Sequence, residues 1–274
     1  MNKRRILAIA MSLCIVAILA VGASLAYFTD TDNATNTFTT GGVEIKLEEK
    51  QRKVVDGEKT TDLIDFGTDS KLLMPIVGSA QGEKDAIGMP TAKNYVDKMV
   101  TIKNTGSSAA YIRAYFAIPS ALDAGYDEDF NASLNVLHFN FGNVVAADGT
   151  ITSTYGNQWL WGTEAKEGHG GWNYFNTTIN NIPYNVYYAD YYKAVAPEED
   201  TEMLIQGVYL DNHIDMKNGK YIDTRDAKGE ADLSILEGKV SCPVFAVAAQ
   251  ADGFTSASEA ITAAFGADYD PWNP

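Results

Sequence analysis

Apolar and polar residues alternate with a period of two over much of the chain, which is the pattern of half-buried β-strands. In the first such stretch Val43, Ile45 and Leu47 alternate with charged residues. Similar stretches follow at 100–103, 111–118, 137–141, 204–210 and 240–249. Pro243 interrupts the last of them, and because proline lacks the N–H of a central strand, this stretch is expected at a sheet edge or a bulge.

A tight reversal is predicted between two of these stretches. Asn104-Thr105-Gly106-Ser107 contains the Asn and the Gly that tight turns favour. We therefore predict a hairpin that joins 100–103 to 111–118. Alternate residues of the second arm are apolar and should share one face of a sheet, namely Ile112, Ala114, Phe116 and Ile118.

One strong helix signature stands near the C-terminus. Ser256 followed by Glu259 fits a capping box, and Gly266 stands where a left-handed stop belongs. Many strands and one late helix predict an all-β fold, a single antiparallel β-sandwich or jelly-roll domain with long loops and a short C-terminal helix. The polar stretches 50–93 and 211–238 are interpreted as long loops or small insertions within that domain.

The N-terminus has the features of a secretory signal peptide. A basic start at residues 3–5 precedes the uncharged residues 6–25, and Ser24 and Ala26 place small side chains at the two positions that a signal peptidase reads. We expect cleavage after Ala26, so that a secreted, extracellular protein begins at Tyr27.

An uncleaved anchor is the alternative, because the uncharged run continues to residue 28 and about 20 apolar residues span a bilayer. Under either interpretation everything after Tyr27 is exported. Residues 1–26 are thus expected to be the signal, and 27–274 the β-sandwich domain, with a polar N-terminal arm at 27–40.

Cysteine content and charge limit the function classes. Cys14 lies in the signal, so the mature chain keeps only Cys242 and an internal disulfide is impossible. Stability must come from a core. Removal of the signal leaves 36 acidic and 21 − 3 = 18 basic groups, a net charge of −18. Such a surface repels nucleic acid and anionic lipid, so neither is an expected partner.

The stretch LAYFTDTDNATNTFTTGGVEIKL, residues 25–47, resembles the signal-to-first-strand region of the TasA and camelysin family. These are exported proteins of Gram-positive bacteria that use a dedicated SipW-type signal peptidase. In their pattern a small residue, here Ala26, precedes an aromatic pair, here Tyr27 and Phe28. A run of Thr, Asp and Asn follows, then Asn36-Thr37-Phe38, a Gly and an alternating strand.

The resemblance implies a jelly-roll fold and self-association into extracellular matrix fibres, in which the N-terminal segment of one subunit completes the sheet of the next. The assembly residues would be Phe38, Val43, Ile45 and Leu47, because a polar arm without a core can bond its backbone to a neighbour's open edge. The plainer interpretation makes 35–47 an ordinary first strand of its own domain, and this is expected for an isolated monomer.

The same family carries a metallopeptidase label, which the residues of this chain do not support. A zincin needs the His-Glu-x-x-His spacing. The three histidines, His138, His169 and His213, lie more than thirty positions apart, and none is followed by Glu. Cys242 lies in an apolar pattern that suits a buried hydrophobe better than a nucleophile. We therefore predict no catalytic residue, no metal and no cofactor, and expect the chain not to be an enzyme.

Two weaker features could carry binding. Trp159, Trp161 and Trp172 flank a Gly-rich stretch and, if exposed, could stack on sugar rings of a polysaccharide; packing within the fold is the favoured alternative. Pairs of carboxylates could bind calcium, but without an Asp-x-Asp-x-Asp-Gly loop solvated acids are the favoured interpretation. These pairs are Asp30 with Asp32 and Asp211 with Asp215.

The sequence therefore predicts a secreted, non-enzymatic structural protein of the cell surface or biofilm matrix. The alternative is a secreted carbohydrate-binding or adhesive module, and a camelysin-like extracellular metallopeptidase comes third. The signal peptidase and further copies of the chain are the expected partners.

Overall fold

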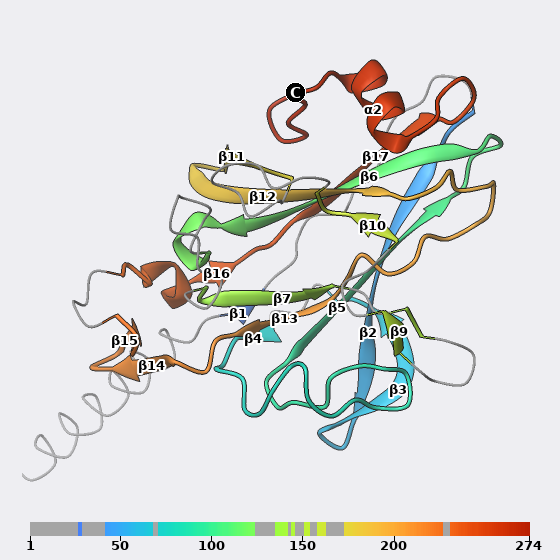
Figure 1. Ribbon diagram of the computed structural model, residues 1–274. Helices are drawn as coiled ribbons and strands as arrows, with labels where there is room; N and C mark the ends of the chain where they lie inside the picture. Colours follow the sequence, from blue (N-terminus) through green and yellow to red (C-terminus); the bar gives the residue numbers. More distant parts are fainter. Residues whose placement is uncertain are drawn as a thin grey trace, which may run out of the picture.

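A computed structural model of the chain describes residues 27–28, 42–67, 71–123, 135–141, 144–145, 151–153, 158–162, 173–226 and 231–274. Within these residues the fold is all-β with one short C-terminal helix, as predicted. Two five-stranded sheets lie one above the other and form a sandwich (Figure 1).

The neighbouring strands of both sheets are antiparallel. The first sheet has the order β3 (Glu58–Asp65), β2 (Ile45–Val55), β5 (Val96–Asn104), β13 (Ile205–Leu210) and β7 (Leu137–Phe141). The second has the order β10 (Trp159–Leu160), β12 (Ile182–Tyr191), β6 (Ala110–Pro119) and β17 (Val244–Gln250), with β11 (Tyr174–Ile179) also paired to β12.

Smaller elements flank the sandwich. The strand β1 (Tyr27–Phe28) runs parallel to β16 (Lys239–Val240) and antiparallel to β4 (Lys71–Leu72). Two further antiparallel pairs are β14 (Ile214–Lys217) with β15 (Lys220–Asp223), and β8 (Val144–Val145) with β9 (Ile151–Ser153). The helical elements are the 3-10 turns η1 (Ser120–Leu122) and η3 (Ser234–Glu237) and the helix α2 (Ala257–Phe265).

The main core lies between the two sheets and is built from the alternation seen in the sequence. Even-numbered apolar residues of β6 point inward, as predicted, and Phe116 and Ile118 are fully buried there. They meet residues such as Val100 and Ile102 of β5 from the opposite layer. One continuous core therefore stabilises the domain without a disulfide, in line with the single free Cys242.

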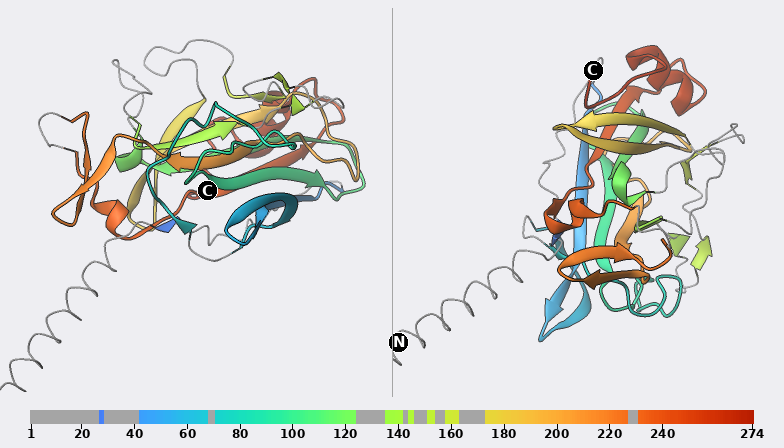
Figure 2. Two further views of the ribbon diagram at one scale, coloured as in Figure 1. Left: turned by 90° about the horizontal axis from the view of Figure 1, so that it is seen from below. Right: turned by 90° about the vertical axis from the view of Figure 1, so that its left-hand side faces the viewer.

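Both sheets are also covered on their outer faces. Ile261 of α2 and Trp272 of the C-terminal segment pack on Tyr115 and Val247 of the second sheet. The right-hand view of Figure 2 shows α2 above that sheet. On the first sheet, a cluster around Met89 and Tyr95 covers the outer side of β5. The outer faces of both sheets are thus covered in part, whereas most of β3 stays exposed.

The predicted hairpin between 100–103 and 111–118 is wrong. The strands β5 and β6 lie in opposite sheets, so the chain crosses from one layer to the other between them. The Asn104 amide donates to the carbonyl oxygens of Ser108 and Val195, both at 2.8 Å, and the Gly106 N–H donates to Glu44 O at 3.0 Å. The bonds to Val195 and Glu44 fix the Asn-Gly turn to other segments instead of to its own flanking strands.

The interpretation of 50–93 as loop is corrected for its first part. The strand β2 continues to Val55 and returns as β3 through a turn at Asp56 and Gly57, whose φ angles are 52° and 85°. An Asp-Gly pair supplies the positive φ angles that a two-residue hairpin needs. That pair was the sequence signal for the hairpin. The stretch 211–238 is a small insertion, as predicted, containing β14, β15 and η3.

The last predicted strand is divided. Residues 241–243 separate β16 from β17, and the Pro243 carbonyl accepts from Ala117 N–H at 3.0 Å. As predicted from Pro243, β17 lies at the edge of its sheet.

The helix α2 has the predicted cap. Ser256 Oγ accepts from the Glu259 N–H at 3.2 Å, and Glu259 Oε2 accepts from the Thr255 N–H at 3.0 Å. Gly266 ends the helix with a φ of 95°.

Ser256→Ala should lower the free energy of unfolding by about 0.5–2 kcal/mol. Urea denaturation of this variant and of Ser258→Ala, an exposed helix position, checks this; equal losses would contradict it.

A lysine is buried inside the sandwich. Lys98 is 0% exposed, its Nζ lies 2.9 Å from Glu49 Oε2, and it lies 5.3 Å from the centre of the Phe66 ring. Burial lowers the pKa of Lys98 to about 7. Glu49 is the ion-pair partner of the charged form of Lys98.

This lysine should make stability rise with pH above 7. The unfolded chain keeps the Lys98 proton up to about pH 10.4. The folded chain releases it above about 7, so between these values the unfolded state binds more protons and stability increases with pH. Urea denaturation between pH 7 and 9 should show a rise that Lys98→Met abolishes. A variant with the same pH dependence as the parent would contradict this.

Candidate assembly edge

The strand β17 is the last strand of its sheet among the described residues and has no backbone partner on its outer side there, although Val244, Ala246 and Ala248 are only 3%, 0% and 3% exposed. It pairs with β6 on one side and is last in its sheet. The Pro243 carbonyl and the Ala251 N–H bond to Ala117 and Ala109, so the odd-numbered residues between them face β6. Because the direction alternates along a strand, the N–H and C=O groups of 244, 246, 248 and 250 point away from β6.

This edge lacks the devices that usually protect an edge strand. The sequence of β17, VFAVAAQ, has no charged residue. By contrast β3 carries four charged residues and a register shift, both of which oppose pairing with another chain. On β11 the C-terminal segment covers part of the strand, since Asn273 Nδ2 donates to Thr177 Oγ1 at 2.7 Å. Of β3, β11 and β17, only β17 lacks these devices; β7 and β10 also end a sheet.

The described residues on either side of the undescribed part of the N-terminal arm lie near this strand. Tyr27 and Phe28 pair in parallel with Lys239 and Val240, directly before β17. Val43 lies at the other end of β17, where it lines a groove together with Ala248–Gln250. Residues 29–41, which connect the two places, lie outside the described residues.

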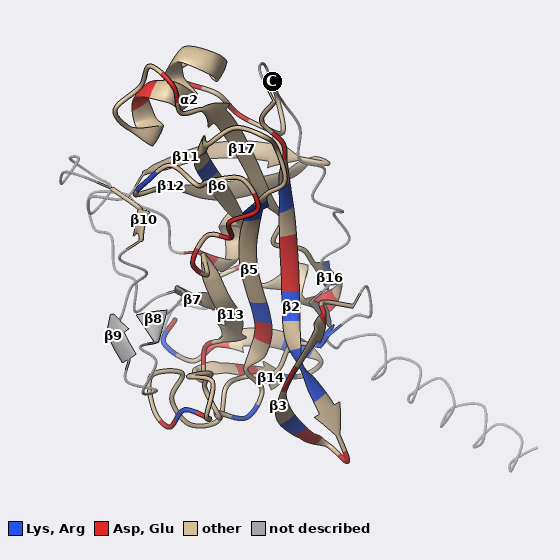
Figure 3. Ribbon diagram, turned by 90° about the vertical axis from the view of Figure 1, so that its right-hand side faces the viewer, with Lys and Arg blue, Asp and Glu red and all other residues tan. Residues whose placement is uncertain are grey.

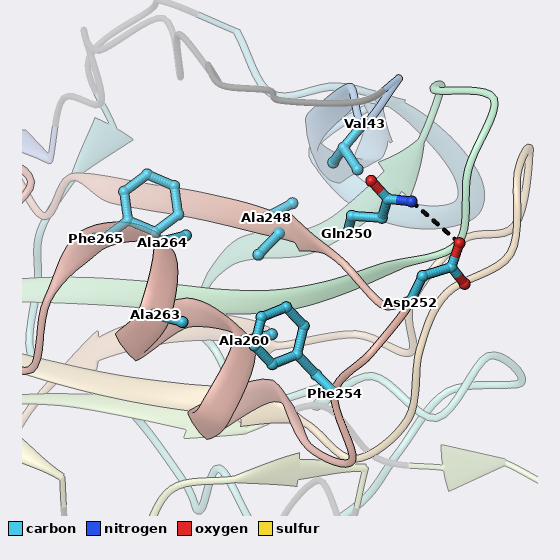
Figure 4. Close-up of a pocket in the computed structure, with 10 residues that line it drawn as sticks. Val43, Ala248, Gln250, Asp252, Phe254, Ala260, Ala263, Ala264 and Phe265 are labelled. Atoms are coloured by element: carbon cyan, nitrogen blue, oxygen red, sulfur yellow. Dashed lines mark hydrogen bonds between the residues drawn. The ribbon is translucent and has the colours of Figure 1, made fainter.

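The groove at the end of β17 has a volume of about 390 Å³ (Figure 4). Small alanine side chains of β17 and α2 form much of its lining, and a hydrogen bond of 3.1 Å from Gln250 to Asp252 lies at its rim. Its lining residues are Val43, Ala248, Ala249, Gln250, Asp252, Phe254, Ala260, Ala263, Ala264 and Phe265. A hollow lined by alanines and two phenylalanines suits an apolar side chain.

The predicted assembly residues lie in their own domain. Val43, Ile45 and Leu47 are 1%, 6% and 8% exposed and belong to the main core. This is the ordinary first strand expected for an isolated monomer, and it means that these side chains are not free to bury in a neighbour. Phe38 lies outside the described residues, as do Ser24 and Ala26 of the predicted cleavage site.

The tryptophans expected as sugar platforms are packed inside the fold. Trp159 and Trp161 are 3% and 8% exposed and belong to the main core. The Trp159 indole N–H donates to Glu202 O at 2.9 Å. The packing interpretation is therefore confirmed for these two, because buried rings cannot stack on a ligand. Trp172 lies outside the described residues.

Two of the three histidines meet at one carboxylate, which sequence reasoning missed. His138 Nε2 lies 2.8 Å from one oxygen of Asp211, and His213 Nδ1 lies 2.8 Å from the other. Arg225 lies 3.4 Å from Asp211 as well. Burial would raise the pKa of Asp211, but the bonds from His213 and His138 and the charge of Arg225 bring it below its ordinary value.

These groups form a structural ion-pair network. They join β7, the end of β13 and the β14–β15 insertion, and Arg225 also binds Asp223 at 2.6 Å. Asp215, the second half of the proposed calcium pair, accepts from the Met216 N–H instead. His169 lies outside the described residues. No local motif could have predicted the network, because its members come from separate elements.

The described part of the chain holds no group of three or more His, Cys, Asp or Glu side chains arranged for a metal ion. Cys242 is fully buried, and burial raises the pKa of its thiol to about 12. It therefore stays protonated and is a packing residue, as the apolar pattern predicts. No helix within the described ranges has the length and apolar character needed to cross a membrane.

No protein-family model, no curated protein and no solved structure matches the chain significantly.

Proposed function

We propose that the protein is an exported, non-enzymatic structural protein of the cell surface or biofilm matrix, related to the TasA and camelysin family and processed by a SipW-type signal peptidase. The observation that supports this best is the unpaired, uncharged outer edge of β17, with Tyr27 and Phe28 beside the strand that precedes it and Val43 near its other end. An unpaired edge without charged residues is a candidate acceptor for strand addition between copies.

In this proposal, cleavage after Ala26 frees the arm, which then pairs with β17 of a neighbouring copy. Phe38 supplies the large apolar side chain for the alanine-lined groove, and burying it contributes about 1.5–3 kcal/mol. The backbone bonds of the strand add to this. The contact is head-to-tail, so it gives filaments when the rotation between copies does not close.

Removing residues 27–38 should abolish filament formation, because it removes the added strand; β1 is lost with it, but the residues of the main core, which begin at Val43, remain. Purified 27–274 and 39–274 are compared by light scattering and electron microscopy across salt and pH. Moderate salt should promote assembly, since it screens the net charge of −18. Phe38→Ala, which keeps the backbone of the arm, is the matched variant and should weaken assembly without abolishing it.

Equal filaments from both chains, or none from 27–274 in any condition, would remove the arm from the mechanism. Processing is checked separately by N-terminal sequencing of secreted material, which should begin at Tyr27. A membrane-held protein with residues 1–26 intact would contradict the cleavage.

A further inference from the structure

The strand β11 forms an exposed, uncharged edge of the second sheet. It pairs with β12 on one side, and in the described part of the chain no strand pairs with its other side. Its sequence, YFNTTI, has no charged residue and no proline, and its pairing with β12 has no register shift. In Figure 3 charged residues colour β2 and β3 but not β11. Because Asn176 and Thr178 are exposed, another strand can approach this edge.

The turn between β11 and β12 determines which backbone groups lie at the edge. Ile179 pairs with Ile182 across the turn Asn180-Asn181, whose φ angles are 51° and 66°. In a hairpin with such a two-residue turn, the residues next to the turn exchange both backbone hydrogen bonds. The direction alternates from there along the strand, so the N–H and C=O groups of 174, 176 and 178 point away from β12.

The C-terminal segment, residues 267–274, lies against this edge. Asn273 Nδ2 donates to Thr177 Oγ1 at 2.7 Å and to the outward-pointing Thr178 O at 3.4 Å. Thr177 Oγ1 in turn donates to Asp270 of the segment. Figure 1 shows the C-terminus above β11. A further strand would lie about 4.8 Å from β11 and bond to the same carbonyl. The Asn273 amide therefore takes the place of a donor from that strand.

Side chains hold the C-terminal segment on the sheet. Trp272 packs edge-on against Tyr115 and Phe245, with ring centres 6.5 Å and 6.1 Å apart. Within the described residues the backbone–backbone hydrogen bond of the segment is local, from the Asn273 N–H to Asp270 O at 3.2 Å. Because the attachment depends on a few side chains and not on a strand ladder, replacing those side chains should release the segment.

We propose that the edge of β11 is a contact surface for the β11 of a second copy, and that the C-terminal segment keeps this edge closed in the single chain. The edge is self-complementary in an antiparallel pair. Across a twofold axis Asn176 lies opposite Asn176 of the second copy, and Tyr174 lies opposite Thr178 of the second copy, so the outward N–H and C=O groups bond to each other. This isologous contact gives a closed dimer, and it uses neither the N-terminal arm nor β17.

The test uses the chain 27–274 with Asn176→Cys as the reporter, since the remaining Cys242 is buried. Residues directly opposite in a hydrogen-bonded antiparallel pair have Cα atoms about 5.5 Å apart, which a disulfide spans. Under mild oxidation, removal of residues 267–274 should produce a disulfide-linked dimer, and the chain that keeps them should stay monomeric. Thr178→Cys in the shortened chain is the matched control. It is exposed on the same strand, but the twofold pairing holds its two copies apart, so it should not cross-link.

A variant of full length separates release of the segment from loss of the fold. Trp272→Ala combined with Asn273→Ala removes the ring that packs on Tyr115 and the donor to Thr178 O. Together with Asn176→Cys it should also form the dimer. Circular dichroism confirms that each chain is folded.

The absence of a dimer through position 176 in both folded chains would overturn the inference. Equal dimer yield with and without an attached C-terminal segment would show that the segment does not close the edge. Equal yield at positions 176 and 178 would show random collision instead of strand pairing. All three results leave the filament proposal intact, because that contact uses β17. Loss of filaments with the dimer retained would contradict the proposed function alone.

Discussion

Asp97→Ala should lower the free energy of unfolding by about 3–5 kcal/mol, because it leaves the buried Arg52 guanidinium without its main partner. The two Asp97 oxygens accept from Arg52 Nε at 2.8 Å and from Arg52 NH2 at 2.7 Å. Their side chains are only 2% and 3% exposed, so water screens this pair little. Lys59 also loses a partner at 2.7 Å.

The loss of stability in Asp97→Ala should be larger than the loss of one ion pair alone would give. Arg52 also binds Asp85 at 2.8 Å and Pro90 O at 2.9 Å, and it thereby fixes the segment that covers the first sheet to the hairpin. Urea denaturation followed by circular dichroism measures the effect. Asp65→Ala in the same hairpin is the control, since its pair with Lys50 is 88% and 36% exposed. Such an exposed pair contributes about 0–1 kcal/mol. If the free energy of unfolding falls by similar amounts in Asp97→Ala and Asp65→Ala, water must hydrate the Arg52 guanidinium, and the expectation is contradicted.

The same carboxylate makes stability depend on acid pH. Burial alone would raise the pKa of Asp97, but bonds and charges from Arg52 and Lys59 hold it below its ordinary value. The stabilisation is therefore complete above the unfolded value of about 3.9 and is lost as pH falls through the lower folded value.

Several strands and the helix could be predicted because the sequence signals that specify them are local. Period-two alternation identified β6 and the stretches around β7 and β13, and the Ser256 capping box identified α2. The same alternation did not predict which charged residues are buried. Lys98 occupies an inward position of β5 between Val96 and Val100, where alternation alone suggests a mere polar interruption. Its burial depends on Glu49 of another strand, which no local pattern records.

Long-range placement was the part that sequence could not supply. The turn after Asn104 has the residues of a hairpin, yet the bonds of Asn104 and Gly106 to distant carbonyls make it a crossing between sheets. The same holds for the candidate edge. The uncharged sequence of β17 was visible, but its open side depends on the order of strands in the folded sheet.

Ala248→Pro should abolish filament formation while the domain stays folded. The N–H of residue 248 points away from β6, so proline removes a donor from the open edge and leaves the ladder to β6 intact. Edge strands tolerate proline at such positions, and the preceding Val247 is already extended. Electron microscopy of purified 27–274 measures filaments, and thermal unfolding confirms that the variant is folded.

Three further variants make this result decisive. Ala248→Ser keeps the N–H at the same position and should still form filaments. Gln250→Pro removes another outward N–H at a more exposed site, so it tests the edge even if the ring disturbs packing at 248. Val247→Pro removes an N–H that faces β6 and should destabilise the domain, because it breaks a hydrogen bond of the ladder. If the folded Ala248→Pro and Gln250→Pro chains both assemble like the parent, the added strand does not pair with β17, and the acceptor must be sought on another edge of the sandwich.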